Sequence, residues 1–322
     1  MADVHRATVV IITWNRPGYV DTCLSHLGRL HRPADQVLVV DASADVRTAE
    51  VVSRYPWAKR IAFPGGAGHM TRSRNQALLH ANGDVVCYLD DDVKVQPQWL
   101  DEVLAAFTGD EAVGAVAGRT LNGQPGEETA GADAIGRLMD DGQLTGNFAA
   151  DPGKIVEVDH GIGANMSFRA AVLADLGGFR DDFPGTALRE DTDIYLRVRS
   201  LGHKAVFSPW AVVEHEAAPH VKGKRFDWRY LFWGRHNHAL LLSRNFGLGS
   251  SQFRRWLVWA VLGSFSETGR SLPRRLLRVV VSLAGTAAGV VTSLRKAGWS
   301  ATAPVANGPA AENLRAALTA TR

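Results

Sequence analysis

Short, uninterrupted hydrophobic runs recur along the first part of the chain, and each ends in polar or turn-forming residues. The clearest are ATVVIIT, QVLVVDAS and GDVVCYLDDD, which begin at Ala7, Gln36 and Gly83. Runs of this length, rich in Val, Ile and Leu, are typical of strands that are buried on both faces of a parallel sheet. EAVGAVAGRT predicts a later strand, and KAVFSPWAVVEH predicts a last one that ends at His215.

Helix-like stretches lie between these runs. They cover Arg16–Leu30, Val46–Arg54 and Arg72–Ala81, and the first has a proline near its first turn. The alternation of strand and helix predicts a doubly wound α/β domain. Farther along, SFRAAVLADLGGF predicts a helix closed by Gly177–Gly178, and REDTDIYLRVRS predicts another. Asn122–Pro152, rich in Gly, Asp and Ala, predicts a long loop or mobile flap.

The pattern changes at Lys222, where basic and aromatic residues become frequent. RYLFWGRHNHALLLSRNFG and FRRWLVWAVLGSF resemble helices, and Val279–Leu294 is uncharged over 16 residues. A bilayer span needs about 20 apolar residues, so we expect a buried or interfacial helix, with a single membrane span as the alternative. We therefore predict a catalytic domain at 1–221, a basic helical extension at 222–299 and a flexible tail at 300–322.

Composition places the chain among ordinary globular proteins. It has 322 residues, of which 46% are hydrophobic and 21% charged, enough for one large domain and an appendage. Its two cysteines give neither a disulfide framework nor a metal-ligand spacing, which indicates a reducing compartment. The N-terminal MADVHRATVVIITW lacks the features of a signal peptide. We expect a cytoplasmic protein.

The net charge of +3 conceals an asymmetry. Residues 1–221 hold 20 Lys and Arg against 30 Asp and Glu, a net of −10, whereas residues 222–322 hold 16 against 3, a net of +13. A basic appendage indicates an anionic partner, and we expect peripheral attachment to an anionic membrane at its inner face, or docking of a lipid-phosphate acceptor. The alternative is that these helices merely cover the acceptor side of the catalytic domain. Nucleic acid is not expected, because the aromatic residues near 228–233 are interpreted as packing residues.

Acidic residues stand at the ends of two predicted strands. Asp41 closes the second run, and Asp90, Asp91 and Asp92 close the third. In open α/β sheets the ligand lies outside the carboxyl ends of the strands, so these acids should converge on one crevice. Mg²⁺ and Mn²⁺ prefer carboxylate oxygens and are commonly shared with substrate phosphates. The acids predict a cation site for a nucleotide diphosphate, and for an isolated acidic triplet a solvated turn is the alternative.

Six motifs in order resemble the family 2 glycosyltransferases, which are inverting enzymes with the GT-A fold. VVIITWNRP is similar to the turn against the nucleotide base, VLVVDAS to the second strand, and GGAGHMTRSRNQAL to the segment leading into the helix behind the donor. YLDDDV resembles the metal-binding DXD motif, GANMSFR the loop beside the donor sugar, and REDTDIYLRVRSLGHKAVFSPWAVVEH the acidic pair and the terminal histidine. The resemblance covers residues 7 to about 217. It implies a mixed, mostly parallel sheet flanked by helices.

The resemblance also implies roles for single residues. Asp92 would ligate a divalent cation, Mn²⁺ or Mg²⁺, together with Asp90 and His215. Asp191 would be the general base, with Glu190 as its catalytic neighbour. The implied donor contacts are Thr13, Asn15, Arg16, Asp41, Arg74, Asn75, Asp90, Asp91 and Asn165.

The implied function is transfer of a sugar from a nucleotide-diphosphate donor to an acceptor hydroxyl with inversion. UDP-sugars are the commonest donors in the family, and the acceptor stays open among carbohydrates, lipid-linked molecules and small molecules. One alternative is a nucleotidyltransferase, which leaves the Glu190–Asp191 pair unexplained. Another is a non-catalytic nucleotide-sugar-binding or membrane-adaptor protein. Alternatively, the acidic pair could have no catalytic role and simply form the first turn of a helix, where the helix dipole favours acids. His236 and His238 do not indicate a metal site, because residues two apart do not share a helix face.

Overall fold

The computed structural model describes residues 5–216, 227–265, 272–295 and 308–320. The first part alternates as predicted, through β1 (Ala7–Thr13), α1 (Pro17–Leu27), β2 (Gln36–Asp41), α2 (Arg47–Ser53), β3 (Ala58–Ala62), α3 (Met70–Leu78), β4 (Val85–Asp90), β5 (Val93–Val95), α4 (Trp99–Thr108) and β6 (Val113–Leu121). It continues through β7 (Val156–Glu157), β8 (Asn165–Arg169), α5 (Ala170–Leu176), α6 (Glu190–Ser200) and β9 (Lys204–His215). The later helices are α7 (Trp228–Phe246), α8 (Ser251–Gly263), α9 (Leu272–Arg295) and α10 (Gly308–Thr319).

The described strands form one mixed sheet. Its order is β3-β2-β1-β4-β8-β6-β9-β5, and β7 pairs with β9. Strands β3, β2, β1 and β4 are parallel, so their carboxyl ends meet at one edge, where Thr13 lies opposite Asp41 and Ile12 opposite Asp90. Strand β8 runs antiparallel to both β4 and β6. The sheet therefore gathers at one edge the strand ends that carry the predicted acids.

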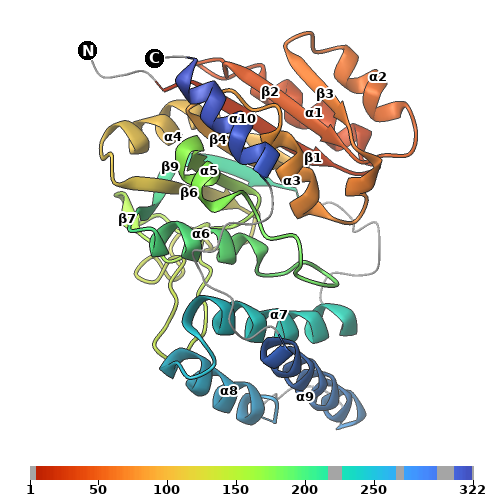
Figure 1. Ribbon diagram of the computed structural model, residues 1–322, viewed down its shortest axis with the longest axis vertical. Coiled ribbons are helices and arrows are strands. Elements are labelled where there is room, and N and C mark those ends of the chain that lie inside the picture. The colour runs from red at the N-terminus through yellow and green to blue at the C-terminus, as the bar shows by residue number, and fades with distance from the viewer. Residues whose placement is uncertain (1–4, 217–226, 266–271, 296–307, 321–322) are drawn as a thin grey trace.

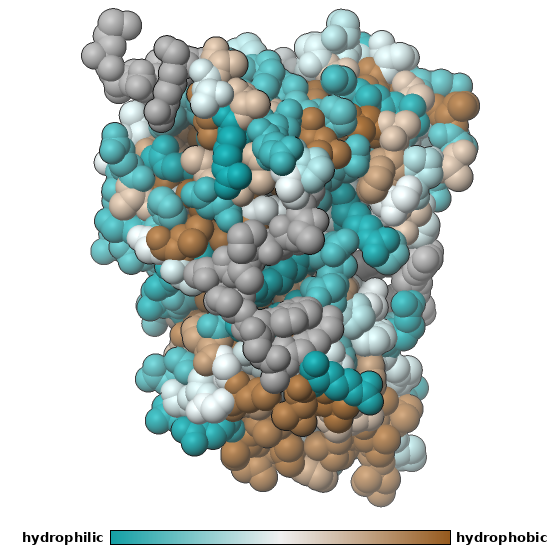
Figure 2. Space-filling model, viewed as in Figure 1, coloured by the Kyte–Doolittle hydropathy of each residue, from teal (hydrophilic) through white to brown (hydrophobic). Residues whose placement is uncertain are grey.

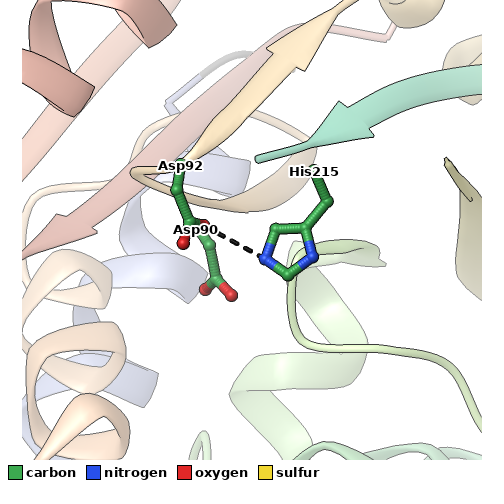
Figure 3. A group of neighbouring side chains, drawn as sticks. All are labelled: Asp90, Asp92 and His215. Carbon is green, nitrogen blue, oxygen red and sulfur yellow. Dashed lines mark ion pairs between the residues drawn. The ribbon is translucent and has the colours of Figure 1, made fainter. Parts of the chain in front are cut away.

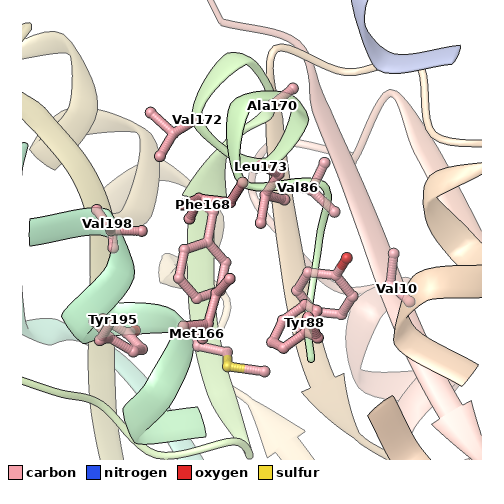
Figure 4. Close-up of a cluster of buried hydrophobic side chains, with 14 of the residues drawn as sticks. Val10, Val86, Tyr88, Met166, Phe168, Ala170, Val172, Leu173, Tyr195 and Val198 are labelled. Atoms are coloured by element: carbon pink, nitrogen blue, oxygen red, sulfur yellow. The ribbon is translucent and has the colours of Figure 1, made fainter. Parts of the chain in front are cut away.

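Two hydrophobic cores fill the faces of this sheet, because successive strand residues point to opposite sides. On one face, Val10 and Phe168 pack with residues of α3, α5, α6 and α10 (Figures 1 and 4). On the other face, Val9 and Trp99 pack with residues of α1, α2 and α4. Helices therefore cover both faces and leave the strand-end edge for polar residues.

Strand β8 differs from the sequence prediction. The pattern predicts a helix that includes residues 167–169, but these residues form the end of β8, and the helix α5 begins only at Ala170. The strand alternates Met166 and Phe168 toward one core over just five residues, too few to stand out beside the helical pattern that follows. The predicted end of the helix is confirmed, because Gly177 adopts the left-handed conformation with φ of 67°.

The segment Asn122–Pro152 contains none of the named strands or helices, as expected for a loop, but it is held in place. Ile135 and Phe148 are buried in the core shared with α5 and α6. The Arg119 guanidinium donates a hydrogen bond to the backbone oxygen of Ala149 at 2.9 Å. These contacts fix the segment against the carboxyl end of β6.

Helices α7, α8 and α9 form a separate layer at one end of the molecule (Figure 1). Helix α7 packs against both α8 and α9. It also reaches the sheet domain, where the Arg244 guanidinium pairs with Asp182 at 2.7 Å and the Asn245 amide donates to Asp193 at 3.0 Å. The predicted boundary at residues 221 and 222 lies outside the described residues.

Helix α10 occupies part of the stretch for which a flexible tail is predicted. It returns to the sheet and packs on α3 and α5. Leu314 is buried there, and the Asn313 amide donates to the backbone oxygens of Leu78 at 2.8 Å and Ala81 at 3.0 Å. Asn313 thus caps the carboxyl end of α3, and α10 is part of the sheet domain.

Candidate functional site

Two aspartates and a histidine meet at the strand-end edge. Asp90 ends β4, Asp92 lies in the turn after it, and His215 ends β9. His215 reaches the aspartates because β5 pairs with β9 and sets Val93 opposite His215. One potential ligand atom from each of the three residues lies within 4.8 Å of the others (Figure 3). Two carboxylates and an imidazole form a donor set that fits a divalent cation.

This cluster concentrates negative charge in a partly buried place, where Asp92 is buried and the Asp90 side chain is 34% exposed. The His215 Nε2 atom lies 3.3 Å from an Asp92 oxygen. Burial raises the pKa of Asp90, and the charge of Asp92 raises it further. Burial likewise raises the pKa of Asp91 to about 7, although Arg16 opposes the shift. A bound cation would stabilise such a cluster, because it would compensate the charge of the desolvated carboxylates.

Asp91 is tied to the turn that follows β1. The Thr13 hydroxyl donates to Asp91 at 2.7 Å, and the Arg16 guanidinium donates to it at 3.0 Å. Asn15 supports the same turn through a left-handed backbone, with φ of 57°, and its N–H donates to the Ser43 hydroxyl at 2.8 Å. Asp91 is buried. It therefore holds the predicted nucleotide-binding turn against the end of β4.

Asp41 lies at the same edge, but its carboxylate is enclosed. The side chain is fully buried. One oxygen accepts from the Ser43 backbone N–H at 2.9 Å, and the other accepts from the Arg60 guanidinium at 2.8 Å. Asp41 thus fixes the turn after β2.

Arg74, on α3, connects the strand-end acids with the acidic pair of α6. Its side chain is 1% exposed. One terminal nitrogen donates to Glu190 at 2.6 Å, and the other lies 3.6 Å from Asp90 and donates to the Gly163 backbone oxygen at 3.4 Å. Burial lowers the pKa of Arg74, but the charges of Glu190 and Asp90 outweigh it and the net pKa is raised. A charged guanidinium therefore joins α3 to a helix that begins more than 100 residues later in the chain.

Glu190 and Asp191 begin helix α6, so the helix dipole favours both carboxylates. They differ in environment. Glu190 is buried, and burial raises its pKa to about 8 in spite of Arg74. Asp191 is half-buried, and its two oxygens accept from the backbone N–H groups of Gly163 at 3.2 Å and Thr192 at 2.8 Å. Asp191 is therefore the oriented and more accessible member of the pair.

Two predicted donor contacts, Asn75 and Asn165, are used within the protein. The Asn75 amide exchanges hydrogen bonds with the Phe179 backbone at 2.7 and 2.8 Å. Asn165 is 1% exposed; it accepts from the Trp99 indole at 2.9 Å and donates to two backbone oxygens. Through these bonds both side chains hold segments around the site in place.

Sequence reasoning missed two neighbours of Asp191. Arg189 precedes the acidic pair with φ of 82°, a left-handed conformation that costs energy in a residue with a side chain. His160 is buried, and burial lowers its pKa, while the charge of Asp191 acts in the opposite direction. Arg189 stands in the REDTD motif only as the residue before the acidic pair, and His160 lies outside all six motifs. A strained backbone and a buried histidine become visible only in three dimensions.

The sequence is similar to those of known glycosyltransferases. A family model described as Glycosyl transferase family 2 matches residues 8–177, which include Arg74, Asp90 and Asp92. The chain is 27% identical over 258 residues to the probable glycosyltransferase YdaM of Bacillus subtilis (strain 168), covering 75% of this chain and 57% of the relative. It is 27% identical over 236 residues to the pre-mycofactocin glycosyltransferase of Mycobacterium tuberculosis (strain ATCC 25618 / H37Rv), covering 71% of this chain and 46% of the relative. The chain spans about half the length of these curated relatives.

Two solved structures share the fold. The mannosyltransferase PcManGT from Pyrobaculum calidifontis, in complex with GDP-Man and Mn²⁺, superposes with a TM-score of 0.54 at 18% identity, covering 98% of this chain and 86% of that one. GalNAc-T7 with UDP, GalNAc and Mn²⁺ superposes with a TM-score of 0.61 at 14% identity, covering 86% of this chain and 55% of that one. These likenesses confirm the predicted GT-A fold.

Proposed function

Because the chain belongs to glycosyl transferase family 2, we propose that it transfers a sugar from a nucleotide-diphosphate donor to an acceptor hydroxyl with inversion, and that Asp191 is the general base. The observation that carries the proposal is the position of Arg74. Its guanidinium contacts Asp90 in the strand-end cluster and Glu190 beside Asp191. These contacts support the assignment of the candidate cation ligands and the candidate general base to one site.

At the donor end, Asp90, Asp92 and His215 would hold a divalent cation. When bound, the cation supplies Lewis-acid stabilisation of the negative charge on the departing nucleoside diphosphate. The imidazole ligand favours Mn²⁺ over Mg²⁺. Both similar solved structures contain Mn²⁺, one with GDP-Man and one with UDP. A UDP-sugar is our first candidate donor, and GDP- and dTDP-sugars belong in the same test.

At the acceptor end, Asp191 has the exposure and orientation that a base needs. The backbone N–H groups of Gly163 and Thr192 hold its carboxylate. As the acceptor oxygen bonds to the anomeric carbon, its proton passes to Asp191 and the bond between that carbon and the phosphate oxygen breaks. Attack from the face opposite the phosphate inverts the anomeric configuration. Glu190, buried against Arg74, positions the start of α6.

A donor panel scored by release of nucleoside diphosphate, with and without Mn²⁺, tests the proposal. The variant Asp191→Asn should lower kcat by about 10²–10⁴-fold while donor affinity, measured by calorimetry, is kept. Asp181→Asn, an exposed acid paired with Arg72 at the surface, is the matched control and should keep the full rate.

Three other outcomes would each lead to a different conclusion. Transfer at the original rate by Asp191→Asn would remove the assigned base. Release of pyrophosphate would support a nucleotidyltransferase. Donor binding without any turnover across the panel would support a nucleotide-sugar-binding module.

A further inference from the structure

Helix α9 buries small and polar side chains and exposes apolar ones, which is the reverse of what is expected for a helix in water. Its buried residues are small or polar, and they include Ser282, Gly285, Gly289 and Ser293. A β-carbon at Gly285 would lie 2.4 Å from one backbone oxygen of α7, and a β-carbon at Gly289 would lie 2.5 Å from another. The close approach of the two helices therefore requires these glycines. Small residues at a helix interface are typical of packing in lipid, where burial of apolar side chains gives no advantage.

The outward side of α9 is apolar. Leu272, Leu276, Val280 and Leu294 on this helix, with Val258 and Leu262 on α8, are each 58–65% exposed. We call these six residues the α8–α9 apolar face. Figure 2 shows hydrophobic residues gathered over these two helices at the end of the molecule. A contiguous apolar surface of this kind marks an interaction site.

Charge on the same two helices indicates what covers the face. Arg254 lies in the first turn of α8, and Arg274 lies in the first turn of α9, on the other side of the helix from Leu276. Both arginines are exposed. Residues 222–322 hold 16 Lys and Arg against 3 Asp and Glu. Apolar side chains on helices that also carry exposed arginines in their first turns complement a surface with an apolar interior and anionic headgroups.

The packing of α9 also limits how it can meet a membrane. Its length and its mean hydropathy of 1.6 over an 18-residue window would allow a span. However, the Ser293 and Ser243 hydroxyls are 2.8 Å apart, and the Thr292 hydroxyl lies 3.0 Å from His236. Helix α7, which carries Ser243 and His236, is itself bonded to the sheet domain through Arg244. The part of α9 from Ser282 to Ser293 is held by α7, so only one side of that part can face a membrane.

We propose that the α8–α9 apolar face docks the protein on an anionic lipid surface, with α8 and α9 lying in the interface and the sheet domain remaining in water. The arginines contact lipid headgroups, and the leucines and valines enter the boundary with the acyl chains. The depth of insertion is about 5–10 Å, as for other interfacial helices. This inference does not depend on the glycosyl-transfer reaction.

Sedimentation of the full chain with vesicles tests the proposal. We expect binding to vesicles of phosphatidylcholine with phosphatidylglycerol, and weaker binding to phosphatidylcholine alone. The double variant Leu276→Ser and Val280→Ser should lower the partition coefficient by about tenfold or more. The double variant Arg254→Gln and Arg274→Gln should lower it about fivefold per charge on the anionic vesicles only. Val46→Ser is the matched control, because Val46 is 66% exposed on the sheet domain, outside the face.

The variants change exposed side chains, so an unchanged thermal unfolding midpoint verifies that each is folded. Failure of the full chain to sediment with anionic vesicles would overturn the proposal. A dimer in solution that Leu276→Ser and Val280→Ser converts to a monomer would make the face a contact between two copies. Retention in vesicles after alkaline carbonate extraction would show a spanning helix in place of an interfacial one.

Discussion

At the scale of single residues, several polar side chains at the strand-end edge are held by hydrogen bonds within the protein. The family resemblance implies donor contacts for Asp41, Asn75 and Asn165. In the structure, Arg60 and Ser43 bond to the Asp41 carboxylate. The Phe179 backbone occupies the Asn75 amide, and the Trp99 indole and backbone oxygens occupy the Asn165 amide. A motif records that a residue type is needed at a position. It does not distinguish a contact with ligand from a bond that shapes the loop around it.

Glu190 gives a prediction about pH. Burial raises the pKa of its carboxyl from 4.5 to about 8, against the effect of Arg74. Between these two pH values, the folded protein therefore retains a proton that the unfolded chain releases. The stability that depends on the protonated carboxyl is fully present below pH 4.5 and is lost as pH rises through about 8. Glu190→Gln does not titrate. Its unfolding midpoint relative to wild type should rise between about pH 5 and about pH 9.

Thermal unfolding of both proteins across this range is the measurement. Comparing their midpoints at each pH cancels the groups that titrate in both. A midpoint difference that stays constant, or falls as pH rises, would contradict the assigned pKa direction.

At the scale of elements, a strong hydrophobic pattern is enough to predict β1, β2, β4 and α7. Elements that are short, or that depend on partners distant in the sequence, are not predicted. Strand β8 has five residues and lies between β4 and β6. Its existence depends on partners from elsewhere in the chain, which local sequence does not show. Helix α10 is not predicted for a related reason. Its Ala-rich sequence forms a stable helix here because its buried side packs on α3 and α5.

Leu314 on α10 gives a test of this docking. Its side chain is 1% exposed and packs in the core that contains Ala77 and Leu173. Leu314→Ala should lower the free energy of unfolding by about 2–5 kcal/mol, the range for a buried leucine. Chemical denaturation measures the change. Glu312→Ala, on the exposed side of the same helix, is the control and should change it by less than about 0.5 kcal/mol. Equal effects of the two substitutions would mean that α10 is not docked in solution.

At the scale of the whole molecule, the acidic and basic parts of the chain contain different elements. The acidic part contains the sheet, the candidate cation ligands and the candidate base. The basic part contains the helices α7, α8 and α9, and also α10, which packs on the sheet domain. Charge alone can be counted from the sequence, but the inward position of Gly285 and Gly289 cannot be inferred from it. Only the packing of α7 on α9 shows that the apolar side of the extension is turned outward.

The cation cluster gives a final prediction, which concerns the stability of the entire sheet domain. Asp90 and Asp92 lie at one end of β4, and His215 comes from β9, with β8 and β6 between these two strands in the sheet. A cation that binds only the folded arrangement stabilises it by mass action, by about 2.7 kcal/mol at a hundredfold excess over Kd. For a domain of this size we expect Mn²⁺ with a nucleoside diphosphate to raise the unfolding midpoint by about 5 °C. Asp92→Asn should lose most of this shift, whereas Asp181→Asn should keep it. An equal response in the two variants would place the stabilising ion outside the cluster, and removal of the ion with a chelator should return the wild-type midpoint to its starting value.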